Sequence, residues 1–386
     1  MDDQVTAIVL DCGSSNTRAG FAGDDAPRAI FPSVVGVPKQ KAAMVGVGLK
    51  SFYVGDEAEA YRGIQTLSRP VQHGQITNWD NMERLLHHSF YNELRIAPEE
   101  HPILFSVPVM NSLMNQEKYA QVLFETFAAP ACAGVLAPVL SLYASGRGTG
   151  IVVEIGGGVT QIVPIYESKI IDEAIIRKDF GGDDLTNYMA RMLTERSAGT
   201  ASLTSGQVMD VEKLKTLCCY VAADYDQEIN EFAATSGKDM VYAFSDGSQH
   251  KVGAERIRTG EALFKPALVG SEMPGVHKML YESVLKCPMD TRRDFYGNFI
   301  VSGGTTLMNG FADRLQAEMV KLVPSTMRSK VVAPPERKYS TWIGGSIIAS
   351  LSTFQAKWFS KSEYDEEGPS GIHKRGCLQT VLNWYH

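Results

Sequence analysis

Two short segments of this 386-residue chain repeat the same pattern of residues. Asp11–Arg18 and Glu154–Gln161 each read acid, any residue, Gly, any three residues, Thr, and each follows an apolar run. A strand that ends in a carboxylate, turns through small residues and re-enters a strand forms a hairpin with backbone N–H groups exposed at its tip. The pattern therefore predicts two hairpins that can hold a polyphosphate between them, with the two carboxylates facing a divalent cation.

Length and charge exclude several classes of protein. A chain of 386 residues is long for one core and normal for two domains. The formal net charge of −7 and the isoelectric point near 5.7 argue against a nucleic-acid surface, which needs clustered Lys and Arg. The longest small-apolar stretch, Ala131–Ser145, contains Pro138 and is too short to cross a bilayer, so it predicts a buried helix.

The cysteines and histidines indicate a reducing compartment and give no metal cluster. The six cysteines show no CxxC pair and no framework spacing, which fits reduced thiols in the cytosol. The eight histidines form neither an HExxH motif nor a Cys/His cluster, so a structural zinc site is not expected. The first residues, Met1–Gln4, lack an apolar segment, so no secretory signal is expected.

Strand and helix patterns alternate along both halves of the chain. In the first half, Asn78 can cap a helix that runs to Leu94. Asn111 or Asn115 can cap a second helix, after the strand Ile103–Phe105. The second half repeats the plan, with strands near Gln161–Tyr166 and Lys169–Ala174 and helices from about Asp184 and Ser205. This plan predicts two α/β domains hinged across a nucleotide cleft.

A third glycine-rich element occurs late in the chain. The strand-like run Phe299–Ser302 leads into Gly303 and Gly304, and a helix is expected from Gly310. Glycines at such a turn let a flat ligand approach the backbone closely, although a plain strand-to-helix turn would read the same way. The chain lacks the P-loop pattern and has no G-x-G-x-x-G after a strand, which excludes the commoner nucleotide motifs.

Several longer segments resemble the actin family. The matching segments are Gly20–Ala29, Tyr53–Ala58, Thr77–Asp80, Phe90–Arg95, Leu140–Arg147 and Ala333–Ser340. The similarity extends from about residue 5 to Cys377 and is specific to actins within the wider superfamily of sugar kinases and chaperone ATPases. It implies a duplicated actin-like ATPase fold, with two hinged α/β domains made of four subdomains around a nucleotide cleft. It also implies ATP or ADP bound with Mg²⁺ or Ca²⁺, and head-to-tail assembly into filaments.

The resemblance also implies where the subdomains begin and end. Subdomain 1 would take residues 1–32, 70–144 and 340–386, and subdomain 2 residues 33–69, including a contact loop at 38–52. Subdomain 3 would take residues 145–180 and 273–339, and subdomain 4 residues 181–272. The expected partners are further copies of the chain and actin-binding proteins at the cleft between subdomains 1 and 3. The expected location is cytoplasmic and cytoskeletal, with neither nucleic acid nor a membrane span involved.

Carried over position by position, the resemblance assigns residues to each part of the nucleotide. Asp11 and Glu154 would hold the cation through its water shell. The phosphates would be wrapped by Gly13, Ser14, Ser15, Asn16, Gly156, Gly157, Gly158 and Val159. Arg18 would reach the β-phosphate, where actins have lysine. The nucleoside pocket would be lined by Gly182, Lys215, Gly304, Thr305, Leu307 and Lys338.

The chain departs from actins at the residues that would handle the attacking water. Actins have glutamine at the position of Ala137, and an alanine side chain cannot hydrogen-bond a water. Actins have histidine at the position of Gln161, and a glutamine orients water in other nucleotide hydrolases. Either Gln161 replaces the missing group from the opposite side of the cleft, or nothing does. Because a water displaced by about 1 Å can cost roughly a hundredfold in rate, we expect at most a weak ATPase.

Further departures affect the cation, the sugar and the base. Glu154 is one methylene longer than the aspartate of actins, and Gly157 replaces a carboxylate that would meet the ribose. The segment Glu212–Thr216, at the adenine wall, also differs from actins. The sequence therefore supports phosphate binding more directly than a preference for adenine.

Three apolar segments bear on assembly. The loop 38–52 carries Met44 and Val45, which fits either a loop buried in a partner or a flexible connector. The loop Lys265–Ser271 corresponds to an apolar plug between filament strands and keeps Leu268 and Val269. Residues 378–386 add an apolar tail, for which docking and disorder are both open.

Three functions are compatible with these patterns. The first is a filament-forming actin that hydrolyses ATP slowly. The second is a non-hydrolysing actin-related subunit of a larger complex that uses ATP as a structural ligand, which Ala137 and the altered tail favour. The third, a phosphotransferase, needs a carboxylate that deprotonates an acceptor hydroxyl, and the obvious candidate, Glu154, is better used on the cation.

Overall fold

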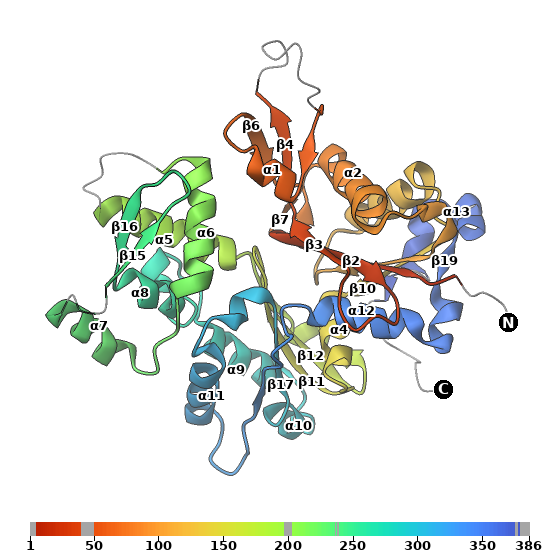
Figure 1. The fold of residues 1–386 in the computed structure, drawn as a ribbon. Coiled ribbons are helices and arrows are strands. Elements are labelled where there is room, and N and C mark those ends of the chain that lie inside the picture. The colour runs from red at the N-terminus through yellow and green to blue at the C-terminus, as the bar shows by residue number, and fades with distance from the viewer. Residues whose placement is uncertain are drawn as a thin grey trace.

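The computed structural model describes residues 5–39, 50–196, 203–235, 237, 239–374 and 377–378. Its centre is two β-sheets, each built around one of the predicted hairpins (Figure 1). Strands Ile8–Cys12 (β1) and Asn16–Phe21 (β2) pair antiparallel, and so do Gly150–Ile155 (β11) and Thr160–Tyr166 (β12). The structure thus confirms both hairpins.

The two sheets share one strand arrangement. In the first, Ala29–Pro32 (β3) pairs with β2, while Ile103–Val107 (β9) lies parallel to β1 and Ala131–Leu136 (β10) parallel to β9. In the second, Lys169–Ile170 (β13) and Ile176–Lys178 (β14) pair with β12, while Phe299–Ser302 (β17) lies parallel to β11 and Val331–Val332 (β18) parallel to β17. Two short strands, Phe359–Ser360 (β19) and Cys377–Leu378 (β20), extend the first sheet beyond β10. The matching order confirms the duplicated α/β fold.

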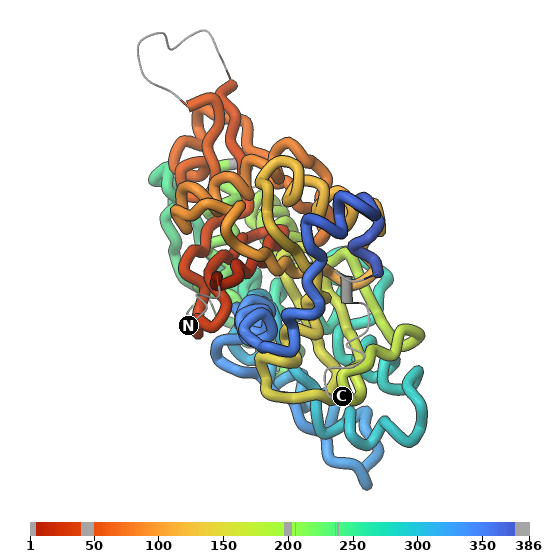
Figure 2. The backbone as a smooth tube through the Cα atoms, turned by 90° about the vertical axis from the view of Figure 1, so that its right-hand side faces the viewer, coloured from red at the N-terminus to blue at the C-terminus, as the bar shows by residue number. Residues whose placement is uncertain are grey.

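Two helices pack between the sheets. Ala137–Ala144 (α4) and Ser340–Ser350 (α12) cross in close contact, because a Cβ added to Gly344 would lie only 1.8 Å from the carbonyl oxygen of Leu140. The buried indole of Trp342 donates from Nε1 to the carbonyl oxygen of Val9 over 3.0 Å. Figures 1 and 2 show this late part of the chain, in blue, beside the early part, in red. Helix α12 therefore completes the core of the first sheet.

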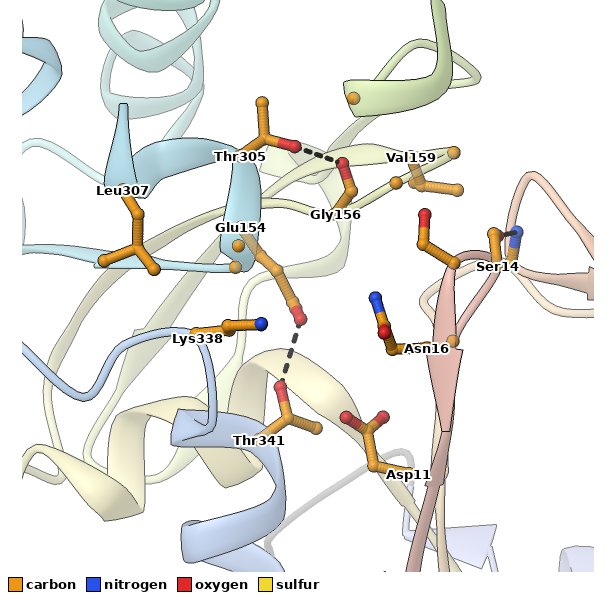
Figure 3. Close-up of a pocket in the computed structure, with 18 of the residues that line it drawn as sticks. Asp11, Ser14, Asn16, Glu154, Gly156, Val159, Thr305, Leu307, Lys338 and Thr341 are labelled. Atoms are coloured by element: carbon orange, nitrogen blue, oxygen red, sulfur yellow. Dashed lines mark hydrogen bonds between the residues drawn. The ribbon is translucent and has the colours of Figure 1, made fainter. Parts of the chain in front are cut away.

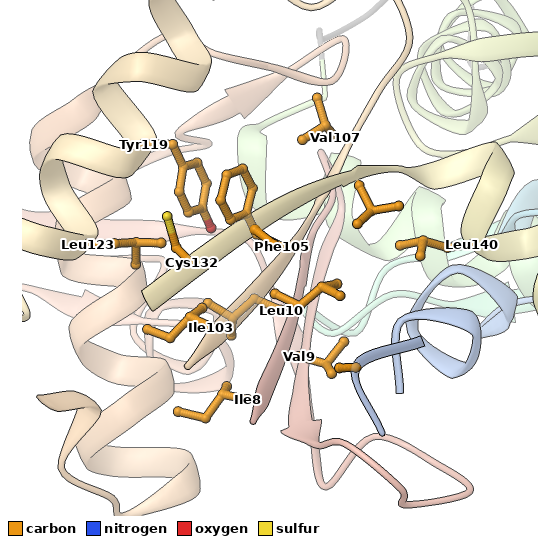
Figure 4. Packing of buried hydrophobic residues seen from close by; sticks show 14 of the residues in the cluster. Ile8, Val9, Leu10, Ile103, Phe105, Val107, Tyr119, Leu123, Cys132 and Leu140 are labelled. Carbon is orange, nitrogen blue, oxygen red and sulfur yellow. The ribbon is translucent and has the colours of Figure 1, made fainter. Parts of the chain in front are cut away.

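Side-chain alternation along β11 places the second sheet between two hydrophobic cores. Val152 packs with the core of the first sheet, whereas Ile151 and Val153 pack with the core on the opposite face. Successive side chains of a strand point to opposite faces, so a strand buried on both faces is apolar throughout. Figure 4 shows part of the first core, where Phe105 stacks on Tyr119 with 4.2 Å between ring centroids.

The remaining elements form two outer parts and the helices that cover the sheets. One outer part, at the top of Figure 1, contains Val35–Pro38 (β4), Tyr53–Val54 (β5), Asp56–Ala60 (α1) and Gln65–Ser68 (β6). The other contains Gly182–Arg196 (α5), Ser205–Cys218 (α6), Tyr225–Ala234 (α7), Met240–Ala243 (β15), Gln249–Val252 (β16) and Glu255–Glu261 (α8). The short hairpin Val71–Gln72 (β7) and Gln75–Ile76 (β8) follows β6. The covering helices include Val276–Lys286 (α9), Arg292–Tyr296 (α10), Phe311–Leu322 (α11) and Lys361–Glu367 (α13).

Four of the predicted helices begin at or close to the positions that the sequence indicates. Trp79–His87 (α2) is capped by Asn78, whose Oδ1 accepts from the backbone N–H of Asn81 over 2.9 Å, and it continues as a π-helix to Leu94. In the second half, α5 begins at Gly182, α6 at Ser205, and α11 directly after Gly310. These starts confirm the helix predictions of both halves.

Three local predictions are wrong. Ala131–Ser145 is not one buried helix: its first part is β10 and only its second part is α4, since small apolar residues suit a buried strand as well as a helix. The cap of Leu113–Gln121 (α3) is neither Asn111 nor Asn115 but Ser112, whose hydroxyl accepts from the N–H of Asn115. Lys169–Ala174 is a strand only over β13 and ends in a 3₁₀ turn, Asp172–Ala174.

Two of the apolar segments expected at assembly surfaces fall largely outside the described residues. They are residues 40–49, which include Met44 and Val45, and residues 379–386. In the third segment, Pro266–Val269 forms a 3₁₀ turn, and Leu268 and Val269 pack half-buried against the chain's own core. Among the described residues, no helix combines the length and the apolar character needed to cross a membrane.

One buried amide in the small outer sheet lacks a partner. Gln65 in β6 is 2% exposed, and neither its Oε1 nor its Nε2 has a hydrogen-bond partner within the described ranges. The amide is packed against Gly36, where an added Cβ would lie 1.7 Å from Oε1. An unpaired buried amide costs about 1–3 kcal/mol, because it loses its water without a replacement. Gln65 therefore destabilises the outer part that contains it.

Replacing Gln65 with leucine should raise the free energy of unfolding by about 1–2 kcal/mol, because leucine has a similar volume and no polar group to desolvate. Denaturant titration followed by circular dichroism measures the change. Gln249→Leu, on the exposed face of β16, is the matched control and should give no gain. Unchanged or lower stability of the Gln65→Leu variant would contradict the assignment of an unsatisfied amide.

Candidate functional site

The two hairpin turns have the same backbone geometry. The first closes with a hydrogen bond from the N–H of Gly13 to the carbonyl of Asn16 (3.1 Å), and the second with one from Gly156 to Val159 (2.9 Å). Within the described residues, four N–H groups at these tips have no acceptor: those of Ser14, Ser15, Gly157 and Gly158. Successive free N–H groups in a turn form a concave site for an anion.

The carboxylate that precedes each turn is paired with the residue opposite it in the hairpin. Asp11 is in register with Arg18, and Glu154 with Gln161. The side chains are also bonded: Arg18 Nη1 donates to Asp11 Oδ2 over 2.5 Å, and Gln161 Nε2 donates to Glu154 Oε2 over 2.7 Å. The two hairpins thus repeat one arrangement, in which the carboxylate is paired with the charged guanidinium of Arg18 in the first and with the neutral amide of Gln161 in the second.

Neighbouring elements supply a second hydrogen bond to each carboxylate. Ser106, in the parallel strand β9, donates its hydroxyl to Asp11 Oδ1 over 2.6 Å. Thr341, in the first turn of α12, donates to Glu154 Oε1 over 3.1 Å (Figure 3). Each carboxylate is therefore oriented from two sides.

The environment of Glu154 disfavours its charged form. Burial and then the charge of Asp11 raise the pKa of the Glu154 carboxyl to about 7, although the hydrogen bonds from Gln161 and Thr341 oppose the shift. Figure 3 shows Asp11 and Glu154 approaching one cavity from opposite sides. A positive charge between the two carboxylates would offset both causes of the shift.

The late glycine-rich element holds the second turn from behind. Gly303 directly follows β17 and has a φ of 94°, and an added Cβ would lie 2.3 Å from the carbonyl oxygen of Ile155, so only glycine fits there. Thr305 then donates its hydroxyl to the carbonyl of Gly156 over 2.8 Å, and Gly182 donates its N–H to the same carbonyl over 3.0 Å. The turn is therefore fixed between the element after β17 and the start of α5.

One cavity of about 300 Å³ brings these elements together. Its wall includes every residue that the sequence assigned to the cation, the nucleotide or the water: Asp11, Gly13, Ser14, Ser15, Asn16, Arg18, Ala137, Glu154, Gly156, Gly157, Gly158, Val159, Gln161, Gly182, Lys215, Gly304, Thr305, Leu307 and Lys338. Figure 3 shows Lys338 and Leu307 on the side of Glu154, and Ser14 and Asn16 on the side of Asp11. The role of each residue stays a prediction.

Other wall residues carry no sequence signal of their own. Ser106 and Thr341, which orient the carboxylates, belong to no motif, and Met308 and Asn309 only follow the glycine-rich element. The duplicated strand order is the one clue to Ser106, because the parallel neighbour of β1 must end beside Asp11. Thr341 approaches from a helix that is distant in sequence from both hairpins.

Gln161, the candidate for positioning water, already uses both ends of its amide. Its Oε1 accepts from the backbone N–H of Val109 over 3.1 Å, and its Nε2 donates to Glu154. It is 4% exposed, and the carbonyl of Val109 is held in turn by Arg177 Nη1 over 2.5 Å. The structure therefore shows Gln161 orienting Glu154. Ala137, the first residue of α4, adds only a methyl group to the wall.

Two buried basic side chains, Arg18 and Lys215, line the cavity. Arg18 has a buried Nε without a hydrogen-bond partner in the described part of the chain, and its guanidinium lies 5.9 Å from the ring centroid of Tyr339. Lys215 donates from Nζ to the carbonyl of Gly182 over 2.6 Å and to the hydroxyl of Thr186 over 2.8 Å. Burial lowers the pKa of the Lys215 ammonium. The unpaired donor of Arg18 fits an anionic ligand.

The sequence matches the family model for actin over residues 2–377. The chain belongs to the actin family. The match covers nearly the whole chain and confirms both the resemblance and the actin-like ATPase fold. Family membership indicates an actin-like nucleotide-binding protein, since actins generally bind ATP or ADP with a divalent cation.

The residues at the site fit such a group. In the part of the chain that the structure describes, no three His, Cys, Asp or Glu side chains converge to hold a metal ion. Asp11 and Glu154 alone would leave most coordination positions to water and phosphate, which is how Mg²⁺ is commonly bound. The free N–H groups of the turns and the Nε of Arg18 would then donate hydrogen bonds to the phosphate oxygens.

Proposed function

We propose that this actin-family chain binds ATP or ADP with Mg²⁺ or Ca²⁺ in the cavity and polymerises head-to-tail into filaments, with slow hydrolysis. The observation that carries nucleotide binding is the pairing of the two hairpins across one cavity, each with a buried carboxylate and a turn of free N–H groups. A cation would offset the repulsion of the carboxylates, and the turns would bind the phosphates from both sides. Bound nucleotide would then link the two sheets.

The nucleoside part of the proposal depends on the wall beyond the second turn. Lys215 and Gly182 come from α6 and α5, and Gly304 and Leu307 come from the element after β17. Gly157 has no side chain to contact a ribose, and an added Cβ would lie 1.9 Å from Ser15 Oγ, so a larger residue would require the Ser15 side chain to move. Ribose contacts therefore have to come from other residues of the wall.

Assembly is supported by the family and by the surface. Leu268 and Val269 are only half-buried, so part of each side chain is available to a neighbour. The net charge of −7 repels like subunits, and divalent cations or salt should promote their association. The four subdomains and a binding cleft between subdomains 1 and 3 belong to the same proposal. A separate small core of Val34, Tyr53 and Ala58 fits subdomain 2 as one of them.

A second function, a non-hydrolysing subunit that keeps ATP as a structural ligand, is favoured by one specific observation. Ala137 offers no hydrogen bond to a water, and the amide of Gln161 is bonded at both ends inside the protein. Binding of nucleotide to the native state stabilises the protein whether or not the nucleotide is cleaved.

Mg-ATP should stabilise the protein by about 2.7 kcal/mol at a hundred times its dissociation constant. Glu154→Gln should weaken Mg-ATP binding about 10- to 100-fold, because the group that positions the cation's water shell loses its charge. Denaturant unfolding with and without Mg-ATP measures the stabilisation, and isothermal titration calorimetry with and without EDTA measures the affinity. Glu99→Gln, at an exposed site, is the control and should bind normally. Equal affinity of wild type and Glu154→Gln would remove this residue from the cation site.

Filament formation is tested by pelleting at protein concentrations on the order of tens of micromolar, with ATP and varied Mg²⁺ and salt. We expect a pelletable polymer whose yield rises with divalent cation. A protein that stays monomeric under all these conditions contradicts the filament proposal and favours the structural-ligand alternative.

Ala137→Gln should speed single-turnover hydrolysis, by up to roughly a hundredfold, because it restores a hydrogen-bonding group at the start of α4. Phosphate release is measured together with light scattering, so that cleavage and assembly are followed in one sample. Ala137→Leu adds similar bulk without a hydrogen bond and is the matched control. An unchanged rate in Ala137→Gln would show that another group, such as Gln161, already positions the water.

A further inference from the structure

The outer rim of the cavity is spanned by an arginine that binds two carboxylates. Arg69 directly follows β6, in the outer part at the top of Figure 1. Its Nη1 lies 2.8 Å from Asp183 Oδ1, and its Nη2 donates to Glu212 Oε2 over 3.0 Å. Asp183 belongs to α5 and Glu212 to α6, which form the other outer part. One guanidinium thus joins both outer parts across the rim.

Asp183 connects this arginine to both hairpin turns. Its Oδ1 accepts from the hydroxyl of Ser15, in the first turn, over 3.1 Å. Its backbone N–H donates to the carbonyl of Gly157, in the second turn, over 2.7 Å. Glu212 is itself part of the cavity wall. The residues bound by Arg69 therefore contact both turns and form part of the wall.

Two further ion pairs join the same two outer parts across the rim. Arg62 Nη2 lies 3.3 Å from Asp210 Oδ2 and also contacts the hydroxyl of Ser245. Lys213 Nζ lies 3.9 Å from Glu59 Oε2, with the signs reversed. Several ion pairs thus bridge the same two outer parts. Arg69 differs from the others because it holds two acids, one of which, Asp183, is hydrogen-bonded to both hairpin turns.

The ion pairs of Arg69 are partly exposed, so added salt should weaken them, but the two carboxylates still stabilise the charged guanidinium. The side chains of Arg69, Asp183 and Glu212 are 29%, 27% and 31% exposed. Burial would lower the pKa of the Arg69 guanidinium, but the two carboxylates outweigh it and raise that pKa. Partly exposed pairs are weakened by added ions, since the Debye length falls to about 10 Å at 0.1 M salt.

We propose that Arg69, Asp183 and Glu212 form an electrostatic latch that closes the rim of the cavity and limits the rate at which bound nucleotide leaves. The inference rests on the proposed nucleotide binding and adds its regulation. A nucleotide under two touching turns can leave only if the outer parts separate, and separation breaks both pairs of Arg69. The latch slows release without contacting the ligand, because Arg69 is not a residue of the cavity wall.

The test is the dissociation rate of etheno-ATP, measured by fluorescence after mixing the loaded protein with excess ATP. Arg69→Gln and Asp183→Asn should each speed release about two- to tenfold. Arg28→Gln is the matched control, since Arg28 forms its ion pair with Asp24 on its own loop, is 60% exposed, and should not alter the rate. Equal rates in wild type and Arg69→Gln overturn the latch.

The salt dependence of the release rate tests the latch without any variant. Release from the wild type should speed up between about 50 and 500 mM KCl, and the dependence should be shallower in Arg69→Gln. A wild-type rate that is independent of salt overturns the latch even if the variants misfold. The charge-reversed pair Arg69→Asp with Asp183→Arg should release nucleotide more slowly than Arg69→Asp alone. Absence of this rescue also overturns it.

The outcomes separate the latch from the function on which it rests. If the wild type binds no etheno-ATP with Mg²⁺, the proposed function fails and the latch fails with it. If nucleotide binds and its dissociation rate depends on neither Arg69 nor salt, the proposed function stands and the latch alone is rejected.

Discussion

Two carboxylates that approach one cavity from separate sheets are the constraint on which this site depends. Asp11 and Glu154 are each oriented by two hydrogen bonds, so neither can turn away to relieve the other's charge. The cost falls on Glu154, whose pKa is raised to about 7 by burial and by Asp11. In the proposed complex a divalent cation would remove that cost, and a polyphosphate would accept from the N–H groups beside it. In this proposal the cation supplies the positive charge that Glu154 lacks within the protein.

The two halves of the fold each supply one hairpin to the site. One difference between the hairpins makes the two sides of the cavity differ in charge. The residue opposite the carboxylate is an arginine in the first hairpin and a glutamine in the second. Asp11 is therefore neutralised within its own hairpin, while Glu154 is only hydrogen-bonded. The same difference provides an unpaired cationic donor, Arg18 Nε, on one side of the cavity only.

Sequence patterns predicted what is local and missed what is brought in from a distance. The hairpins, their carboxylates and the glycine-rich turn after β17 are encoded in runs of a few residues, and the structure places all of them around one cavity. Ser106 and Thr341 reach the carboxylates from a parallel strand and from a late helix, and no run of residues marks them. Ala131–Ser145 was misassigned because small apolar residues do not distinguish a buried strand from a buried helix. The bonds that occupy Gln161 depend on Val109, which no motif links to it.

The contact between α4 and α12 has a consequence for how the molecule can move. Where Gly344 rests on the carbonyl of Leu140, backbone meets backbone with no side chain between them. If one sheet rotated against the other about this contact, the apolar layers on either side would stay covered. Rotation of this kind would carry almost no heat-capacity change, because heat capacity follows the exposure of apolar surface. The temperature dependence of opening would then be set by charges at the rim and not by the hydrophobic core.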